Sequence, residues 1–396
     1  MFPLVITAFT TTSALGRGAE AMRSALQARQ TGLAPCTFDT RARTYTGAVD
    51  GVDDVHLPEA LAVFNCRNNR LAQLGLEQDG FMDSVRSVRE RYGARRVGVI
   101  LGTSTAGIHE TEIAYNHLDP VSGKLPAEYH FETTHNLFAT SQFVRRYLDL
   151  QGPAAMVSTA CSSSAKVFAS AWRLIAAGEV DAVVVGGVDS LCYNTLHGFG
   201  SLGLVSETPT RPCAPDRSGI SIGEAAGFAI VERAGSVGNH TGLALYGYGE
   251  SSDAYHMSTP RPDGAGAALA MERALSCADL KPDAIGYVNM HGTASEVNDA
   301  MEDKAISRVL GTNTPASSTK GWTGHTLGAA GITEAAISFI ALKNGFLPGT
   351  LNTQQVDPTF TSRIILENES AEVSYILSNS FGFGGSNCSL IFGMHE

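Results

Sequence analysis

The chain alternates between short runs of apolar or β-branched residues and longer segments whose apolar residues recur at helical spacing. Several of the short runs contain no polar position, which is typical of strands covered on both faces. The expected strands are Pro3–Thr7, Arg96–Leu101, Ala154–Ser158, Ala182–Gly186, Ala226–Val231, Leu243–Tyr248, Ile285–Met290, Ile364–Leu366 and Tyr375–Asn379. The expected helices are Ala165–Ile175, Ala265–Cys277 and Leu327–Lys343. Strands interleaved with helices in this way predict a layered α/β fold.

A polar, glycine-rich stretch at Arg233–Thr241 separates two parts of the chain, and we place a boundary near residue 240. Each part contains a strand, then a turn of small residues with a reactive side chain, and then a helix. This shared order suggests a duplicated unit, with residues 1–240 carrying a candidate cysteine and residues 241–396 carrying two candidate histidines.

The segment Glu110–Leu137 fits neither pattern, because it is polar and irregular with aromatic residues interspersed. Long excursions of this kind in a compact chain are often caps or partner-binding inserts. A surface loop with a short helix is an equally good interpretation of the same residues.

Composition excludes several classes of protein. Among 396 residues, 43% are hydrophobic and 17% are charged, which indicates a packed globular chain rather than a disordered one. The net charge of −11 argues against broad nucleic-acid binding. No apolar run reaches the roughly 20 residues of a membrane helix, and the N-terminus lacks the basic region of a signal peptide. The seven cysteines show no CxxC spacing, so we expect neither a disulfide framework nor a zinc site, and a cytoplasmic location.

The sequence VSTACSSSA at 157–165 contains a candidate nucleophile. An apolar strand leads into it and an amphipathic helix leads out, so Cys161 is expected at or near a helix N-terminus. Unpaired backbone N–H groups and the helix dipole lower the pKa of a thiol there. The backbone N–H of Cys161 could also donate to a developing oxyanion. On this segment alone, a buried structural cysteine is an equally good interpretation.

Two histidines lie in glycine-rich turns. His291 follows the strand Ile285–Met290 in a His-Gly-Thr turn, and His325 lies in GWTGHTLGAAG before a helix. One such histidine would usually be a satisfied core or surface residue, but two of them with a cysteine at a strand–helix junction favour chemistry. Lys320 could orient a histidine or bias a thiolate if it is buried, or it could be an ordinary solvated lysine. Glu334, on the following helix, could brace the loop.

A glycine turn, NSFGFGGSN at 379–387, follows the last expected strand. Three glycines around an aromatic residue let the backbone present N–H groups inward, and the N–H of Phe383 is a candidate second oxyanion donor. Its ring could also act as a gate on the thiol. A phosphate-binding loop is the competing interpretation, but neither the Lys-Ser/Thr that follows such loops nor a GxGxxG spacing occurs.

Together these segments closely resemble the β-ketoacyl-acyl-carrier-protein synthases, the elongating condensing enzymes of the thiolase superfamily. The matching stretches follow the family's order: STACSSS at 158–164, SIGEAAG at 221–227, SSDAYHMSTP at 251–260, NMHGT at 289–293, STKGWTGHTLGAAG at 318–331 and NSFGFGGSN at 379–387. The resemblance implies a thiolase-like fold in which two similar α-β-α-β-α halves form a five-layered core. Initiating synthases use Cys-His-Asn, and thiolases place a second cysteine where this chain has Phe383.

The resemblance also implies roles for individual residues. The family's nucleophile maps to Cys161, and its two catalytic histidines map to His291 and His325. Its lysine maps to Lys320, and the glutamate that supports the site maps to Glu334. Its two oxyanion amides map to the backbone N–H groups of Cys161 and Phe383. The family's pantetheine-binding hydroxyls map to Thr293 and Ser295, the latter a serine in place of threonine. Thr105 lies where elongating synthases often place a larger apolar residue at the acyl pocket, so the usual fatty-acid chain-length preference does not carry over.

The implied reaction is a decarboxylative Claisen condensation between an acyl group on Cys161 and malonyl-acyl-carrier protein. No metal or redox cofactor is implied, because the phosphopantetheine arm belongs to the carrier. The carrier of this family is acidic, and Arg67 and Arg70 are candidates for docking it. Family members dimerise through the strand after the nucleophile helix, near Ala182–Gly186 here, so we expect a homodimer or a heterodimer with a chain-length-factor-like ketosynthase.

The sequence CRNNR at 66–70 and the long segment Glu110–Leu137 resemble synthases of bacterial aryl-polyene pigment clusters. Two alternative functions stay open at this point. One is a subunit that only binds carriers or only decarboxylates malonyl thioesters, and the other is a thiolase-class acyltransferase that uses coenzyme A.

Overall fold

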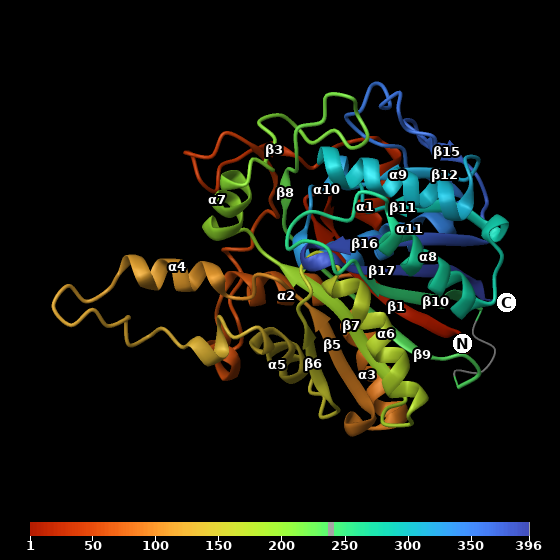
Figure 1. The fold of residues 1–396 in the computed structure, drawn as a ribbon. Coiled ribbons are helices and arrows are strands. Elements are labelled where there is room, and N and C mark those ends of the chain that lie inside the picture. The colour runs from red at the N-terminus through yellow and green to blue at the C-terminus, as the bar shows by residue number, and fades with distance from the viewer. Residues whose placement is uncertain (237–240, 396) are drawn as a thin grey trace.

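Helices and sheet stack in layers in the structure, a computed structural model that describes residues 1–236 and 241–395 (Figure 1). The boundary expected near residue 240 lies outside the described residues and stays a prediction. Within the described parts of the chain, no helix has both the length and the apolar character needed to cross a membrane.

The main sheet repeats one strand order on either side of its centre. The first half runs inward from one edge through β6 (Ala154–Val157), β5 (Val97–Gly102), β7 (Ala182–Asp189), β9 (Ala225–Arg233) and β1 (Leu4–Ser13). The second half runs outward through β10 (Gly242–Ser252), β17 (Ser386–His395), β16 (Tyr375–Gly382), β11 (Ile285–Met290), β12 (Pro315–Ser318) and β14 (Arg363–Ile364). From the antiparallel β1–β10 junction, each half has two antiparallel pairings and then parallel ones.

Two helices fill the space between the sheet halves. They are α6 (Ser163–Ala176) and α11 (Ala330–Asn344), and every residue of α11 up to Ala341 is buried. Alternate residues of one strand face different layers: Val183 and Val185 pack with the central helices, and Val184 packs with the outer ones. The outer helices are α2 (Arg67–Leu76), α3 (Phe81–Tyr92) and α5 (Phe138–Tyr147) on one side, and α8 (Ala265–Ala278) and α9 (Glu296–Leu310) on the other. The predicted five-layered thiolase-like core is confirmed.

Smaller elements complete the chain. The helix α1 (Ala19–Gln27) packs beside α11 through the cluster that contains Met22 and Ile337. The remaining short strands are β2 (Gly16–Arg17), β3 (Ala34–Pro35), β4 (Tyr45–Gly47), β8 (Ile222–Gly223), β13 (Phe346–Leu347) and β15 (Glu369–Ser370). The remaining helices of more than three residues are η1 (Glu59–Phe64), α4 (Ile108–Asn116), α7 (Tyr193–Ser201) and α10 (Lys320–Thr323).

Every strand and helix expected from the apolar pattern is present, although several ends differ. The pattern missed the strands β12 and β17 and several helices, of which α9 is the most informative. Its buried residues include Asp299, Glu302 and Asp303, so its inward face is acidic and does not produce an apolar stripe. The pattern missed α9 because the buried face of this helix carries carboxylates, which are satisfied by hydrogen bonds to other segments.

The expectation that Ala182–Gly186 forms the dimer interface is wrong for this fold. That segment is the start of β7, which pairs with β5 on one side and β9 on the other and is buried throughout. A strand with two neighbours has no free backbone groups to offer another chain. The strand at this edge of the sheet is β6, which pairs with β5.

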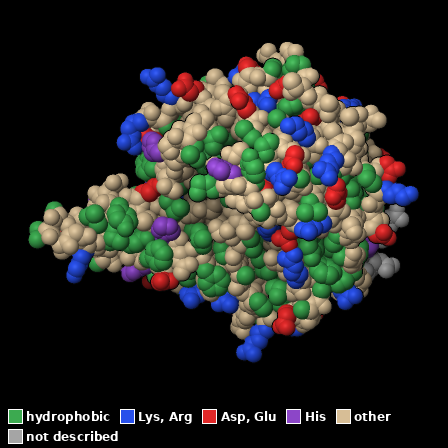
Figure 2. All heavy atoms as spheres, viewed as in Figure 1, with side chains coloured by type: hydrophobic (Ala, Val, Ile, Leu, Met, Phe, Trp, Pro, Cys, Tyr) green, Lys and Arg blue, Asp and Glu red, His purple; other side chains and the backbone are tan. Residues whose placement is uncertain are grey.

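The segment at 108–137 projects from the body as an arm (Figure 1). Of the two interpretations of Glu110–Leu137, the surface loop with a short helix matches the structure, because α4 forms at its start and the rest returns to the body as a loop with the short helix η3 (Phe131–Thr133). A role as a cap or partner-binding insert stays a prediction. The hydroxyl of Thr111 lies 2.7 Å from the Tyr129 hydroxyl and 2.9 Å from His135 Nδ1, which ties the two sides of the arm together. Apolar side chains are exposed among other atoms along the arm (Figure 2). Val121, in the loop after α4, is 95% exposed.

Candidate active site

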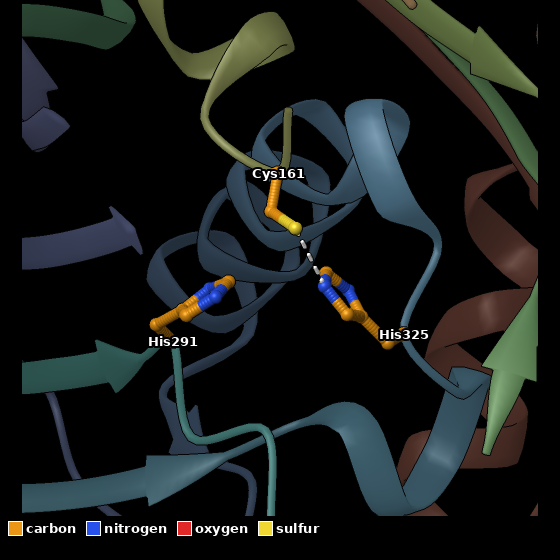
Figure 3. A group of neighbouring side chains, drawn as sticks. All are labelled: Cys161, His291 and His325. Carbon is orange, nitrogen blue, oxygen red and sulfur yellow. Dashed lines mark hydrogen bonds between the residues drawn. The ribbon is translucent and has the colours of Figure 1, made fainter. Parts of the chain in front are cut away.

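Three reactive side chains from distant parts of the chain meet between the sheet halves (Figure 3). Cys161 lies two residues before α6, His291 directly follows β11, and His325 lies between α10 and the short helix η5 (Leu327–Ala329). The Cys161 Sγ atom is 3.0 Å from His325 Nε2, and the centroids of the two imidazole rings are 5.4 Å apart. The cluster predicted from the sequence is thus present, with all three side chains buried.

Left-handed backbone conformations flank each of these side chains. Ala160 has φ +52° beside the cysteine, Ala294 has φ +66° after His291, and Leu327 has φ +53° after His325. Residues with a Cβ adopt this region at a cost of about 1–2 kcal/mol, and such strain concentrates at functional sites. The tight turns bring the backbone of three separate segments close to one point.

Burial dominates the chemistry of the cysteine. It raises the pKa of the Cys161 thiol to about 12, while the Lys320 ammonium acts in the opposite direction. Cys161 lies just before α6, as the sequence predicted. The helix terminus was expected to lower the pKa of the Cys161 thiol, but in the structure this pKa is raised. The thiol is only 6% exposed, and removing water disfavours a thiolate more than the helix end favours it. The resting cysteine is therefore a neutral thiol.

Both histidines are neutral for the same physical reason. Burial, with the Lys320 ammonium as a second cause, lowers the pKa of His291 and of His325 well below the ordinary value. The backbone of His325 is fixed beside β8, because its N–H donates to the Ser221 carbonyl over 2.7 Å and its carbonyl accepts from Gly223 over 3.0 Å. A neutral imidazole can either donate or accept a proton at Nε2.

Lys320 is buried at 2% exposure, so the solvated alternative is wrong. Its ammonium contacts the His291 carbonyl and the Glu334 carboxylate, and it lies 3.4 Å from His291 Nδ1. Burial raises the pKa of the Glu334 carboxyl to about 7, and the Lys320 ammonium opposes that rise. The Ser380 hydroxyl donates to the second Glu334 oxygen over 3.4 Å. Lys320 thus bridges the helix that carries Glu334 and the turn that carries His291.

One positioning residue, Glu302, was missed by the sequence analysis. The Glu302 carboxylate accepts hydrogen bonds from the backbone N–H groups of His291 (2.9 Å) and Gly292 (2.8 Å) and from the Asn379 amide (3.1 Å). These bonds fix the histidine turn to α9 and to β16. The available signal was the pair of acidic residues at Asp299 and Glu302, which share one helix face.

A cavity of about 450 Å³ opens onto the cysteine and both histidines. Thr293, Ser295 and Phe383 line it, in agreement with the sequence analysis. The hydroxyls of Thr293 and Ser295 lie 3.0 Å apart, and the Ser295 hydroxyl also accepts from the first turn of α9. The shape and lining suit a long flexible substrate arm that ends at the sulfur.

Three residues predicted to bind substrate or dock the carrier, Thr105, Arg67 and Arg70, are not among the residues that line this cavity. Thr105 is fully buried, and its hydroxyl donates to Asp189 over 2.9 Å. Arg67 is 6% exposed, and its guanidinium bonds the buried Glu224 carboxylate at 2.7 Å. A docking role for Arg67 is therefore not supported, because its charge is neutralised inside the protein. Arg70 is partly exposed and keeps its docking role as a prediction.

The cluster also has the donor set of a soft metal site, since one ligand atom from each of Cys161, His291 and His325 lies within 4.8 Å of the others. The Lys320 ammonium beside His291 opposes a cation at this point. The absence of a metal requirement stays a prediction.

Comparisons with known proteins agree with this geometry. Residues 1–236 match the β-ketoacyl synthase N-terminal domain, and residues 244–354 match the β-ketoacyl synthase C-terminal domain. A 3-oxoacyl-[acyl-carrier-protein] synthase 2 from Vibrio cholerae is 33% identical over 412 aligned positions, which cover 98% of each chain.

Solved structures show the same similarity. The ketosynthase ApeO, in complex with its chain length factor ApeC from Xenorhabdus doucetiae, is 37% identical with a TM-score of 0.90 and covers 100% of this chain and 98% of its own. A β-ketoacyl synthase from Burkholderia phymatum STM815 is 28% identical with a TM-score of 0.89, and all of both chains is covered. The chain therefore belongs to the β-ketoacyl synthase family and is an acyltransferase, as its motifs predicted.

Proposed function

We propose that this chain accepts an acyl group on Cys161 and condenses it with a malonyl unit on an acyl carrier protein, releasing carbon dioxide. The observation that carries the proposal is the 3.0 Å contact between Cys161 Sγ and His325 Nε2 at the end of a cavity that His291 also lines. A nucleophile in contact with a base, beside a second neutral hydrogen-bond donor, is the arrangement that two-step acyl transfer requires.

In the first step, the Cys161 sulfur attacks the thioester carbonyl of the acyl donor. The thiol proton passes to Nε2 of His325 as the bond forms, and it is returned to the departing carrier thiol when the carbon–sulfur bond of the donor breaks. The amides of Cys161 and Phe383 are the proposed donors to the oxyanion. Loss of one such donor costs about 3–4 kcal/mol in other enzymes.

In the second step, malonyl thioester occupies the same cavity. His291 donates from Nε2 to its carbonyl oxygen, since Nδ1 faces the Lys320 ammonium. His325 is the second donor in the neutral tautomer that carries its proton on Nε2, which it adopts by proton exchange with solvent after the first step. The two hydrogen bonds stabilise the enolate that forms as carbon dioxide leaves. The enolate carbon then attacks the acyl carbonyl, the carbon–sulfur bond to Cys161 breaks, and the sulfur departs as a thiolate that takes up a proton from solvent.

The test is intact-mass measurement of the protein with an acyl-carrier donor, followed by addition of malonyl-carrier. We expect an acyl adduct on the wild type, none on Cys161→Ala, and product formation reduced at least about 10⁴-fold in that variant. Cys277→Ala, at a free cysteine outside the cavity, is the matched control. An adduct that persists in Cys161→Ala would contradict the proposal. An acyl-Cys161 that never condenses would favour the alternative of a non-elongating subunit.

We also propose a partner chain of the same fold, bound at the β6 edge of the sheet. The similarity to ApeO, which is seen with its chain length factor, supports a heterodimer, and a homodimer is the alternative.

The carrier supplies the phosphopantetheine arm, so no cofactor of the chain's own is needed. Membership of the aryl-polyene subgroup is supported by the projecting arm and by the run at 66–70. All seven cysteines are free, which supports a cytoplasmic location.

A further inference from the structure

One wall of the cavity mouth is formed by α7 and the residues that follow it. Phe199 of α7 lines the cavity, and its ring centroid is 5.6 Å from that of Phe383. Leu202, directly after α7, also lines the cavity although it is 58% exposed. The ring of Phe383, which also lines the cavity, thus packs against a residue of α7.

The helix α7 is weakly held by its own sequence. Gly198 and Gly200 lie within it, and glycine is the least favourable residue in a helix apart from proline. Its one fully buried side chain is Leu196, which packs in a small cluster with Leu327, two residues after the catalytic His325. The sulfur of its N-cap residue, Cys192, accepts no backbone N–H of the first turn and lies instead 3.3 Å from the Thr195 hydroxyl. The first turn of α7 thus needs acceptors from elsewhere.

Those acceptors come from the arm. The Glu112 carboxylate of α4 accepts the backbone N–H of Tyr193 over 3.0 Å and that of Asn194 over 2.5 Å. Burial alone would raise the pKa of Glu112, but hydrogen bonds from His109 and these two amides hold it below the ordinary value, so the group is a carboxylate. His109 also packs edge-on against the Tyr193 ring, at 5.5 Å between centroids. A carboxylate at a helix N-terminus satisfies both the orphan amides and the helix dipole.

We propose that Glu112 is a positioning residue for substrate admission: by capping α7 it holds Phe199 against Phe383 and keeps the cavity mouth in the shape that receives the pantetheine arm. The inference rests on the proposed function, because it names which residue shapes the route to Cys161. Glu112 contacts neither Cys161 nor the two histidines of the active site, His291 and His325, so its effect is on substrate binding and not on the chemical step.

The first experiment compares Glu112→Ala with Glu132→Ala, which removes the same charge from the same arm without touching α7. Hydrogen exchange of residues 193–201 is expected to be about 3–10-fold faster in Glu112→Ala and unchanged in Glu132→Ala. The KM for malonyl-carrier is expected to rise about 3–10-fold in Glu112→Ala, while kcat on a small-molecule thioester stays within about twofold. A merely structural role would lower the apparent kcat through loss of folded protein and leave KM unchanged.

A rescue variant separates capping from other effects of the carboxylate. Cys192→Ser places a preferred N-cap residue at the start of α7 with little change in volume. Added to Glu112→Ala, it is expected to recover at least about half of the lost exchange protection. Unchanged hydrogen exchange of residues 193–201 in Glu112→Ala would overturn the capping role. So would faster exchange that Cys192→Ser does not slow at all.

Failure of this inference can be told apart from failure of the proposed function. If the wild type forms no acyl-Cys161, the proposed function fails, but iodoacetamide still reports on the cavity mouth. Alkylation of Cys161 is then expected to be about threefold faster in Glu112→Ala than in Glu132→Ala, because α7 no longer holds Phe199 in place. Equal alkylation rates, or equal KM values for the two variants in an active enzyme, would overturn the role of Glu112.

Discussion

The reactive end of the cavity and its mouth are held in place by different amounts of structure. At the reactive end, which we call the floor (Cys161, His291, His325, Lys320 and Glu334), every side chain is buried and each turn is tied to a second segment. At the mouth (α7 and Phe383), the helix contains two glycines and depends on a carboxylate from a projecting arm. The geometry that the chemistry needs is therefore held by many contacts, while the geometry that substrate entry needs is held by few, which lets the mouth adjust to a long substrate.

Apart from the loss of Cys161 itself, the greatest loss of activity is expected from breaking the buried pair at the floor. Lys320→Met leaves the Glu334 carboxylate without its cation and His291 Nδ1 without its donor. We expect condensation activity to fall about 10³-fold and the unfolding free energy to fall by about 3–5 kcal/mol. Both are measured directly, by product formation and by urea unfolding.

The double variant Lys320→Met/Glu334→Gln sharpens this result. Because no uncompensated charge remains buried, stability is expected to recover by about half, whereas activity stays low since His291 still lacks its donor. Recovery of activity together with stability would contradict a positioning role for Lys320.

The next effect is the pH dependence of the thiol at the floor. With the pKa of Cys161 raised to about 12, the thiolate fraction grows throughout the accessible pH range. The rate of iodoacetamide alkylation should therefore rise about 100-fold from pH 7 to pH 9, at about tenfold per pH unit. Cys36, which is partly exposed, provides the comparison within the same protein. A plateau for Cys161 above pH 8 would show a pre-formed thiolate instead.

A smaller effect comes from adding one methyl group where the central helices cross. A Cβ on Gly331 of α11 would lie 2.4 Å from the Ala165 backbone nitrogen of α6, so one helix must shift. Gly331→Ala is expected to lower the unfolding free energy by about 1–3 kcal/mol, measured by urea unfolding. An unchanged midpoint of urea unfolding would mean that α6 and α11 can separate at this crossing without loss of stability.

The smallest effect is the same substitution at the mouth, with the opposite sign. A Cβ on Gly200 of α7 would meet no neighbouring atom within 4 Å, and the residue has no left-handed φ. Gly200→Ala should therefore stabilise α7 by about 1 kcal/mol, seen as slower hydrogen exchange at 193–201. Faster exchange would show that α7 is held by packing that the methyl group disturbs.

Much of the floor was predictable from the sequence, because its signals are local. Cys161 lies at a strand–helix junction and both histidines lie in glycine turns, and each pattern is visible within about ten residues. Glu302 and the helix that carries it were not predictable, since a buried acidic face looks like a solvated one until its backbone partners are known. The burial of Arg67, which leaves its predicted docking role unsupported, was hidden for the same reason: its partner Glu224 is distant in sequence.

Most strands of the main sheet, the turns that hold the reactive residues and the family of the chain could be inferred from the sequence. The neutral state of the thiol, the place of β6 rather than β7 at the sheet edge, and the capping by Glu112 of a helix 81 residues further along the chain became known only from the folded structure. The physical reason is that turn and strand preferences act between neighbours in the chain, whereas burial, strand neighbours and helix caps depend on segments that meet only after folding.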